Sequence, residues 1–178
     1  MLSYCAITSL DGYVTDSDGR FDWGLPDQQV HEAINEVERG FTTYLYGRRM
    51  YEVMAAWETY DGPSSAESEF ASIWRSAEKI VYSTTLADVS SARTVIERRF
   101  DRDAVRALSE TTDVLIGGPT IAASAFRARL IGEVQLFISP VIVGSGLRTL
   151  PGGIRLDLEL VAERVFGNGV LHASYRVR

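Results

Sequence analysis

The sequence predicts a three-layer α/β fold, formed by a single domain over residues 1–178, with a mixed sheet that ends in an antiparallel hairpin. Short apolar runs alternate with segments whose apolar residues recur at helical spacing, as in a sheet whose strands are joined by helices. Two final strand patterns, 158–166 and 170–177, flank Gly167-Asn168-Gly169, and Asn-Gly between strands is a strong hairpin signal. The 178 residues are 46% hydrophobic, which suits one domain with a sizeable core.

The strand and helix patterns follow one another along the chain. Strand patterns occupy 4–8, 42–46, 79–83, 94–97, a run beginning at 114, and 133–143, and helical spacing appears at 27–37, 50–57, 70–77, 101–110 and 122–130. Pro140 within the sixth strand pattern implies a bulge or an edge there. Segment 9–26 is too long for a simple connection, and long loops in compact domains are often functional.

Composition narrows the function classes. A net charge of −6 argues against nucleic acid as a partner, because binding to a phosphate backbone normally requires a basic surface. No window is apolar enough to span a membrane, and the N-terminus lacks a signal-peptide pattern, so we expect a cytoplasmic protein. Cys5 lies in a strand pattern and is expected to pack as a small hydrophobe. His31 and His172 have no ligand spacing around them, so we predict surface positions and no metal site.

Three strand ends carry groups that suit phosphate. At Gly117-Gly118-Pro119-Thr120 a strand turns into a helix, where free backbone N–H groups and the helix dipole favour an anion. Gly47-Arg48-Arg49 places two cations at a second helix start, which is unfavourable unless an anion lies between them. Ser83-Thr84-Thr85 offers hydroxyls for a phosphate or ribose. Each segment also has a plain structural explanation. The glycines make only a tight turn, the arginines are only solvated, and the hydroxyls form only a turn or a cap.

Ligands of open α/β sheets bind outside the carboxyl ends of the strands. We therefore expect the three strand ends to converge on one extended nucleotide.

Five short motifs appear in a fixed order: Ser9-Leu10-Asp11-Gly12, Trp23-Gly24-Leu25-Pro26, Tyr46-Gly47-Arg48-Arg49-Met50-Tyr51-Glu52, Ile116-Gly117-Gly118 and Ile138-Ser139-Pro140-Val141. Together they resemble the dihydrofolate-reductase-like proteins, particularly the C-terminal reductase domain of the riboflavin-biosynthesis deaminase/reductase and its stand-alone bacterial relatives. The resemblance covers about residues 4–178. It implies a dihydrofolate-reductase-like fold and an NADPH-dependent reductase acting on a flat heterocycle such as a pterin, a pyrimidine or a flavin-like ring.

The resemblance also implies cofactor contacts. Arg48, with Ser83 and Thr84, would hold the adenosine 2'-phosphate, while Ala6 and Ile7 would edge the nicotinamide. The pyrophosphate would lie at the two helix starts. The residues there are Gly47, Arg49, Met50, Gly117, Gly118, Pro119, Thr120 and Ile121. Met50 departs from the hydroxyl residue of dihydrofolate reductases, and Thr120 stands where some members have arginine. The peptide between Gly117 and Gly118 is expected to be cis.

The expected substrate contacts are Asp11, Trp23, Asp27 and Ser139, and the proton donor stays open. In dihydrofolate reductases the acid follows the Trp-x-Leu-Pro run by two residues, which is Gln28 here, with Asp27 one residue early. Because a helix turns by about 100° per residue, the two positions face differently, and dihydrofolate reduction is not predicted. Water, Asp27, Asp11 or Ser139 would supply the proton, with Asp27 alternatively stabilising only its helix.

Two function hypotheses follow. One is the reductase, and the other is a nucleotide-binding sensor or carrier with little or no catalysis. We also predict a homodimer, because the apolar strand 134–143 and the glycine-rich loop after it are expected to leave an exposed sheet edge.

Overall fold

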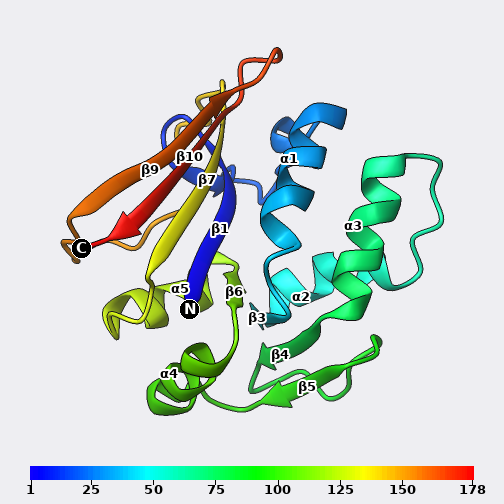
Figure 1. Cartoon of the computed structure of the whole chain (residues 1–178), viewed down its shortest axis with the longest axis vertical. Coiled ribbons are helices and arrows are strands. Elements are labelled where there is room, and N and C mark those ends of the chain that lie inside the picture. Colours follow the sequence, from blue (N-terminus) through cyan, green and yellow to red (C-terminus); the bar gives the residue numbers. More distant parts are fainter.

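The computed structural model describes Met1–Arg178 and contains an eight-stranded sheet with helices on both faces (Figure 1). The strand order is β5-β4-β3-β6-β1-β7-β10-β9. Strands β1 to β7 within it are parallel, and β10 and β9 are antiparallel. This arrangement confirms the predicted mixed sheet and terminal hairpin.

The elements have the following bounds. The strands of the large sheet are β1 (Leu2–Ser9), β3 (Thr43–Gly47), β4 (Glu78–Tyr82), β5 (Thr94–Glu97), β6 (Val114–Gly117), β7 (Glu133–Ser139), β9 (Leu158–Val165) and β10 (Leu171–Val177). The helices are α1 (Gln28–Glu38), α2 (Arg48–Met54), α3 (Ser65–Ser76), α4 (Arg102–Thr111) and α5 (Pro119–Arg127), with 3-10 turns η1 (Asp22–Gly24) and η2 (Ala55–Glu58). None of the helices is long and apolar enough to cross a membrane.

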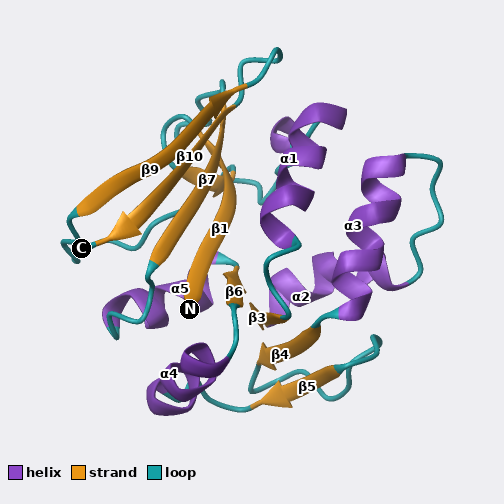
Figure 2. Cartoon of the chain, in the orientation of Figure 1, coloured by secondary structure: helices purple, strands orange, loops and turns teal.

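Two apolar cores lie on opposite faces of the sheet, and they make the three predicted layers (Figure 2). Tyr44 and Phe137 pack with Trp74 on the face covered by α1 and α3. Tyr4 and Phe126 pack on the face covered by α4 and α5, with their rings edge-to-face at 5.4 Å. Because both faces are covered, the central strands are apolar without alternation, as in β6, whose four residues are all buried.

The sixth predicted strand is shorter than expected and is not an edge. β7 ends at Ser139, directly before Pro140, which has no N–H to donate to a ladder. It lies between β1 and β10, so the reason given for an exposed edge at 134–143 is wrong. The exposed edge is β9 instead, where every residue is exposed and Val165 keeps 74% of its surface.

The structure also corrects the two histidine predictions. His31 is 7% exposed, and its ring packs against Trp57 and Phe70, so its predicted surface position is wrong. His172 is half-buried. Its Nε2 atom lies 2.7 Å from Gln135 Oε1, and its ring stacks on a phenylalanine of β7. Burial lowers the pKa of both histidines.

A small second sheet was not predicted. β2 (Tyr13–Thr15) pairs with β8 (Leu147–Arg148), and this pairing ties the long loop after β1 to the glycine-rich loop after β7. Strands of two or three residues carry no periodic pattern that would reveal them in a sequence.

Candidate functional site

The carboxyl ends of the six parallel strands lie at the same end of the sheet. In register, Tyr46 of β3 lies opposite Gly117 of β6, and Gly47 of β3 lies opposite Tyr82 of β4. β1 and β7 end together as well, since their last paired residues are Ser9 and Ser139. The three predicted phosphate corners therefore start from neighbouring strands.

The two glycine corners are in direct contact through Met50 of α2. A Cβ atom added to Gly118 would lie 3.0 Å from Met50 Cβ, and one added to Gly117 would lie 2.8 Å from Tyr46 Cε1. Both approaches are tighter than ordinary carbon contacts. Gly118 is therefore required by the packing of α2 against the end of β6, and Gly117 by the packing of the Tyr46 ring of β3, beyond their part in the turn.

The predicted cis peptide between Gly117 and Gly118 is wrong, because the chain contains no cis peptide bond. The chain changes direction through the φ of Gly118, which is +90°. Glycine adopts positive φ without a Cβ clash, so a trans peptide is enough to produce the corner.

The start of α5 presents free backbone donors. Its first helical hydrogen bond runs from Ala122 N to Gly118 O at 3.1 Å, and Pro119 at the first helical position has no N–H. The amides of Thr120 and Ile121 therefore have no acceptor within the helix. Such a helix start suits an anion, as the sequence predicted.

Arg48 joins the ends of β3 and β4. Its Nη1 donates to Thr85 Oγ1 at 3.3 Å, and its Nε lies 3.5 Å from Glu52 Oε1. The Arg48 side chain is 45% exposed, so its guanidinium is accessible to a ligand. Arg49 beside it is exposed. Two of the predicted phosphate corners thus meet through one side chain.

The hydroxyl of Ser83 acts within its own turn. Ser83 Oγ accepts from Thr85 N at 3.2 Å and from Leu86 N at 2.9 Å, the turn-forming role that the sequence left as an alternative. Thr84 is exposed. The exposed hydroxyls of the 83–86 turn are therefore those of Thr84 and Thr85.

The sheet opens between β1 and β6. Their pairing stops at Tyr4 and Ile116, whereas β1 continues beside β7 as far as Ser9. Leu2 O accepts from Gly132 on the β7 side, so by alternation the peptide groups of Ile7 face the β6 side. Ile7 has no strand partner there, and Ala6 pairs on the opposite side with β7.

The loop after β1 rests on this part of the sheet. Gly24 is buried, and a Cβ added to it would lie 3.2 Å from Ile7 Cγ2 and 3.9 Å from Ser139 Oγ. Trp23 beside it donates from Nε1 to Arg20 O at 3.2 Å and stays half-buried. The structure thus brings Gly24 close to Ile7 and Ser139, with Trp23 next to Gly24 in the chain.

Both predicted acids are already engaged by backbone N–H groups. Asp11 accepts from Gly144 N at 2.7 Å and Val143 N at 3.1 Å, and the Ser9 hydroxyl donates to it at 2.7 Å. These bonds, led by the one from Ser9, lower the pKa of Asp11. Asp27 is exposed and caps α1 by accepting from Val30 N at 2.9 Å.

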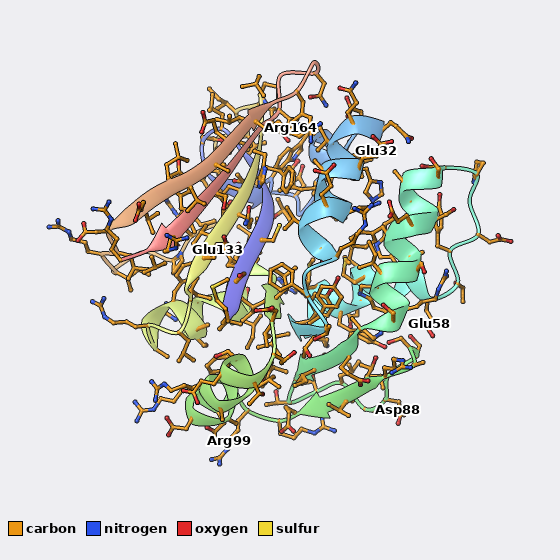
Figure 3. The ribbon with its side chains drawn as sticks, viewed as in Figure 1. Glu32, Glu58, Asp88, Arg99, Glu133 and Arg164 are labelled. Carbon is orange, nitrogen blue, oxygen red and sulfur yellow. The ribbon has the colours of Figure 1, made fainter.

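The capping role of Asp27 is the alternative that the sequence left open, and catalysis by Asp27 stays a prediction. Gln28, at the position of the acid in dihydrofolate reductases, is exposed and donates to Glu32 Oε1 at 2.7 Å and to Ser65 Oγ at 3.2 Å. Glu32 lies on α1, as labelled in Figure 3. Ser139, the remaining predicted side chain, is 4% exposed and ends β7 opposite Ser9 of β1.

Sequence reasoning missed Arg98. Its Nη1 donates to Ser83 O at 3.0 Å and to Leu86 O at 2.7 Å, so it holds both ends of the 83–86 turn. The signal available in the sequence was an arginine directly after a strand that pairs with β4.

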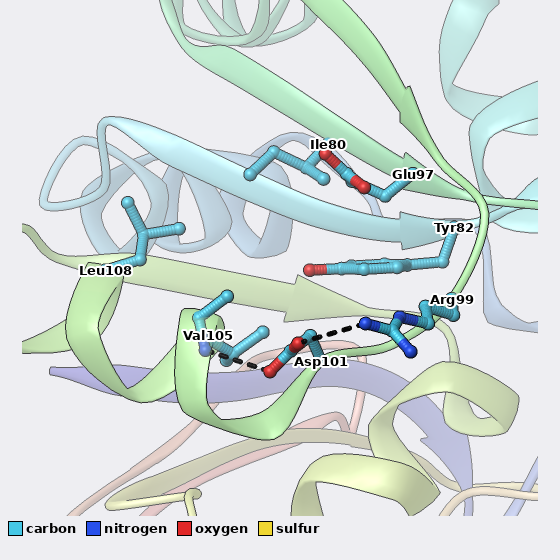
Figure 4. Close-up of a pocket in the computed structure, with 8 residues that line it drawn as sticks. Ile80, Tyr82, Glu97, Arg99, Asp101, Val105 and Leu108 are labelled. Atoms are coloured by element: carbon cyan, nitrogen blue, oxygen red, sulfur yellow. Dashed lines mark hydrogen bonds and ion pairs between the residues drawn. The ribbon is translucent and has the colours of Figure 1, made fainter.

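A hollow of about 260 Å³ lies between β4, β5 and α4 (Figure 4). Tyr82 extends along it, and at its rim Arg99 Nη2 lies 3.8 Å from Asp101 Oδ2. Apolar side chains of Ile80, Val105 and Leu108 line the rest. Because Tyr82 directly precedes Ser83, this hollow adjoins the 83–86 turn.

Comparison with known proteins finds relatives with similar sequences. It is 25% identical over 173 residues to the uncharacterized protein YyaP of Bacillus subtilis, covering 94% of this chain and 89% of YyaP. A 55-residue stretch, 30% of this chain, is 40% identical to 16% of the riboflavin biosynthesis protein RibD of Mycobacterium tuberculosis.

Solved structures share the fold. The superposition on a putative riboflavin biosynthesis protein from Shewanella sp. PV-4 has a TM-score of 0.75 at 19% identity, covering 99% of this chain and 98% of that chain. For a diaminohydroxyphosphoribosylaminopyrimidine deaminase/5-amino-6-(5-phosphoribosylamino)uracil reductase from Thermotoga maritima the TM-score is 0.70 at 15% identity, covering all of this chain and 56% of that chain. The chain thus spans about half of that longer protein.

The family model described as the RibD C-terminal domain matches residues 2–172, nearly the whole chain. This chain therefore belongs to the RibD C-terminal domain family.

Proposed function

We propose that this chain is an NADPH-dependent reductase of the riboflavin-biosynthesis type, which transfers a hydride to a flat heterocycle. The observation that carries the proposal is the bond from Arg48 Nη1 to Thr85 Oγ1. It joins two strand ends beside the free amides of Thr120 and Ile121, so one extended dinucleotide can reach all of these donors.

The phosphate groups fit these donors. Arg48 and the exposed hydroxyls of Thr84 and Thr85 would hold the 2'-phosphate, since a guanidinium forms strong charge-assisted bonds with phosphate. The amides of Thr120 and Ile121 would hold part of the pyrophosphate. A chain with net charge −6 needs such a local set of donors to bind a polyanion.

The nicotinamide end fits the opening between β1 and β6. The peptide N–H and C=O of Ile7 face that opening without a strand partner, and they match the donor and acceptor of a carboxamide. When bound, the reduced nicotinamide supplies the hydride. The buried turn around Gly24 covers Ile7, which would exclude water from the reacting face.

The substrate would lie beside Trp23 and Ser139. Asp11 and Asp27 are engaged in holding a loop and capping a helix, so we propose that water oriented by the Ser139 hydroxyl supplies the proton. The reductase name of the Thermotoga protein supports a pyrimidine-type substrate ring.

The test is a pair of measurements on the purified chain. NADPH and NADH are titrated, and turnover is then screened over pyrimidines, pterins and flavins. Tighter NADPH binding with oxidation in the presence of one of these rings supports the proposal. Binding without turnover of any ring would favour a nucleotide-binding sensor or carrier, and absence of NADPH binding would contradict both.

We further propose a cytoplasmic homodimer that pairs through β9. An edge strand offers unpaired backbone groups, and Leu158, Leu160 and Val165 add exposed apolar surface to it.

A further inference from the structure

The 83–86 turn is held from two directions. From within, Ser83 Oγ accepts the amides of Thr85 and Leu86. From outside, one nitrogen of Arg98 donates to Ser83 O at 3.0 Å and Leu86 O at 2.7 Å. The guanidinium therefore bridges the first and last residues of the turn, and removing it leaves both carbonyls without this donor.

The turn carries the hydroxyl that Arg48 contacts. Thr85 lies between the two residues held by Arg98, and its Oγ1 accepts from Arg48. Ser83 is buried and donates its N–H to Glu97 O, and Leu86 packs against the apolar core, whereas Thr84 and Thr85 between them are exposed. Hydrogen bonds therefore set how the exposed middle of the turn lies relative to Arg48, and those from Arg98 are charge-assisted.

No neighbouring arginine duplicates this contact. Arg99, the next residue, pairs with Asp101 at 3.8 Å, and Arg102 lies 3.5 Å from Asp103 at the start of α4. Loss of the Arg98 guanidinium therefore differs from the loss of one surface charge.

We propose that Arg98 is a positioning residue that fixes the 83–86 turn for the adenosine 2'-phosphate and thereby sets the preference for NADPH over NADH. This inference rests on the proposed function. A carbonyl oxygen repels phosphate, so holding Ser83 O and Leu86 O on Arg98 also keeps these two dipoles away from the anion.

The probes are adenosine 2',5'-bisphosphate and adenosine 5'-monophosphate, which differ only in the 2'-phosphate. Arg98→Met keeps the aliphatic stem and removes the guanidinium, and it should weaken the bisphosphate about tenfold while changing the monophosphate less than about twofold. Arg98→Lys keeps a charged donor and should restore most of the affinity. Arg102→Ala, the control, removes an exposed arginine that does not touch the turn.

Hydrogen exchange without ligand separates positioning from charge alone. In Arg98→Met the amides of Thr85 and Leu86 should exchange faster than in the wild type, and in Arg102→Ala they should not. A thermal melt shows whether each variant is folded. If Arg98→Met does not fold, the exchange rates and affinities of the conservative variant Arg98→Lys test the proposal instead.

The outcomes separate the two proposals. Suppose that the wild type prefers the bisphosphate but that Arg98→Met has the same affinity for it, or the same amide exchange rates, as Arg102→Ala. This result would overturn only the role of Arg98. Equal losses for both probes would overturn it too, as would an Arg98→Lys variant with no preference for the bisphosphate. A wild type with no preference for the 2'-phosphate would overturn the proposed function and this inference together.

Discussion

Replacing Gly118 by alanine tests the corner at the end of β6 most sharply. Gly118 has φ +90°, and a new Cβ would lie 3.0 Å from Met50 Cβ. A non-glycine residue held in a sparsely populated backbone region costs about 1 to 3 kcal/mol, before the crowding of Met50 is counted. For a chain of this length each kcal/mol lowers Tm by roughly 2 to 4 °C, so Gly118→Ala should lower Tm by several degrees.

The same substitution should weaken NADPH more than it destabilises the fold. The strain relaxes by moving the start of α5, where the amides of Thr120 and Ile121 are expected to bind phosphate. Gly152→Ala is the matched control, because Gly152 has no atom within 4 Å of an added Cβ and no positive φ. Thermal melts and NADPH titrations of both variants measure the two effects. A Gly118→Ala protein as stable and as tightly binding as Gly152→Ala would refute the reasoning.

Three further predictions use other residues. Arg48→Ala should weaken NADPH at least about tenfold and leave NADH nearly unchanged in the same titrations, and equal losses would show that Arg48 does not bind the 2'-phosphate. Burial raises the pKa of Glu38 from 4.5 to about 7, so the contribution of this carboxyl to stability is present at low pH and is lost as the pH rises toward 7. In urea unfolding between pH 5 and 8, Glu38→Gln should therefore show a smaller fall in the free energy of unfolding than the wild type. The same pH profile in both proteins would exclude Glu38 as the source of the fall. Light scattering at micromolar concentration should show a dimer for the wild type and a monomer for Leu160→Asp with Val165→Lys, and a wild-type monomer of 19.7 kDa would exclude pairing through β9.

Much of the fold could be predicted because each central element has a local signal. The strand predicted at residues 94–97 has the same bounds as β5, and Asp27 and Asp101 stand directly before helices that they cap. The terminal hairpin follows from Asn168-Gly169. Such signals depend only on neighbours in the chain, so they can be recognised without tertiary information.

The features that could not be predicted depend on contacts between distant segments. His31 is a polar residue on a helix, and only the packing of Trp57 and Phe70 around it shows that it is buried. The edge position of β9 depends on strand order, which spacing along the chain does not contain.

The candidate site shows the same division. That the three strand ends lie side by side could be predicted, because the carboxyl ends of parallel strands meet at the same end of the sheet. The Asp11 bonds to Val143 and Gly144 could not, since they join residues more than 130 positions apart. An acid at the start of a helix suits both capping and catalysis, which is why the two roles of Asp27 were indistinguishable in the sequence.

The most direct test of the central claim is a crystal structure of the chain with NADPH bound. We expect the 2'-phosphate within hydrogen-bonding distance of Arg48 and Thr85, the pyrophosphate at the amides of Thr120 and Ile121, and the nicotinamide carboxamide at the peptide groups of Ile7. A cofactor bound elsewhere, or with its 2'-phosphate in solvent away from Arg48, would contradict the account.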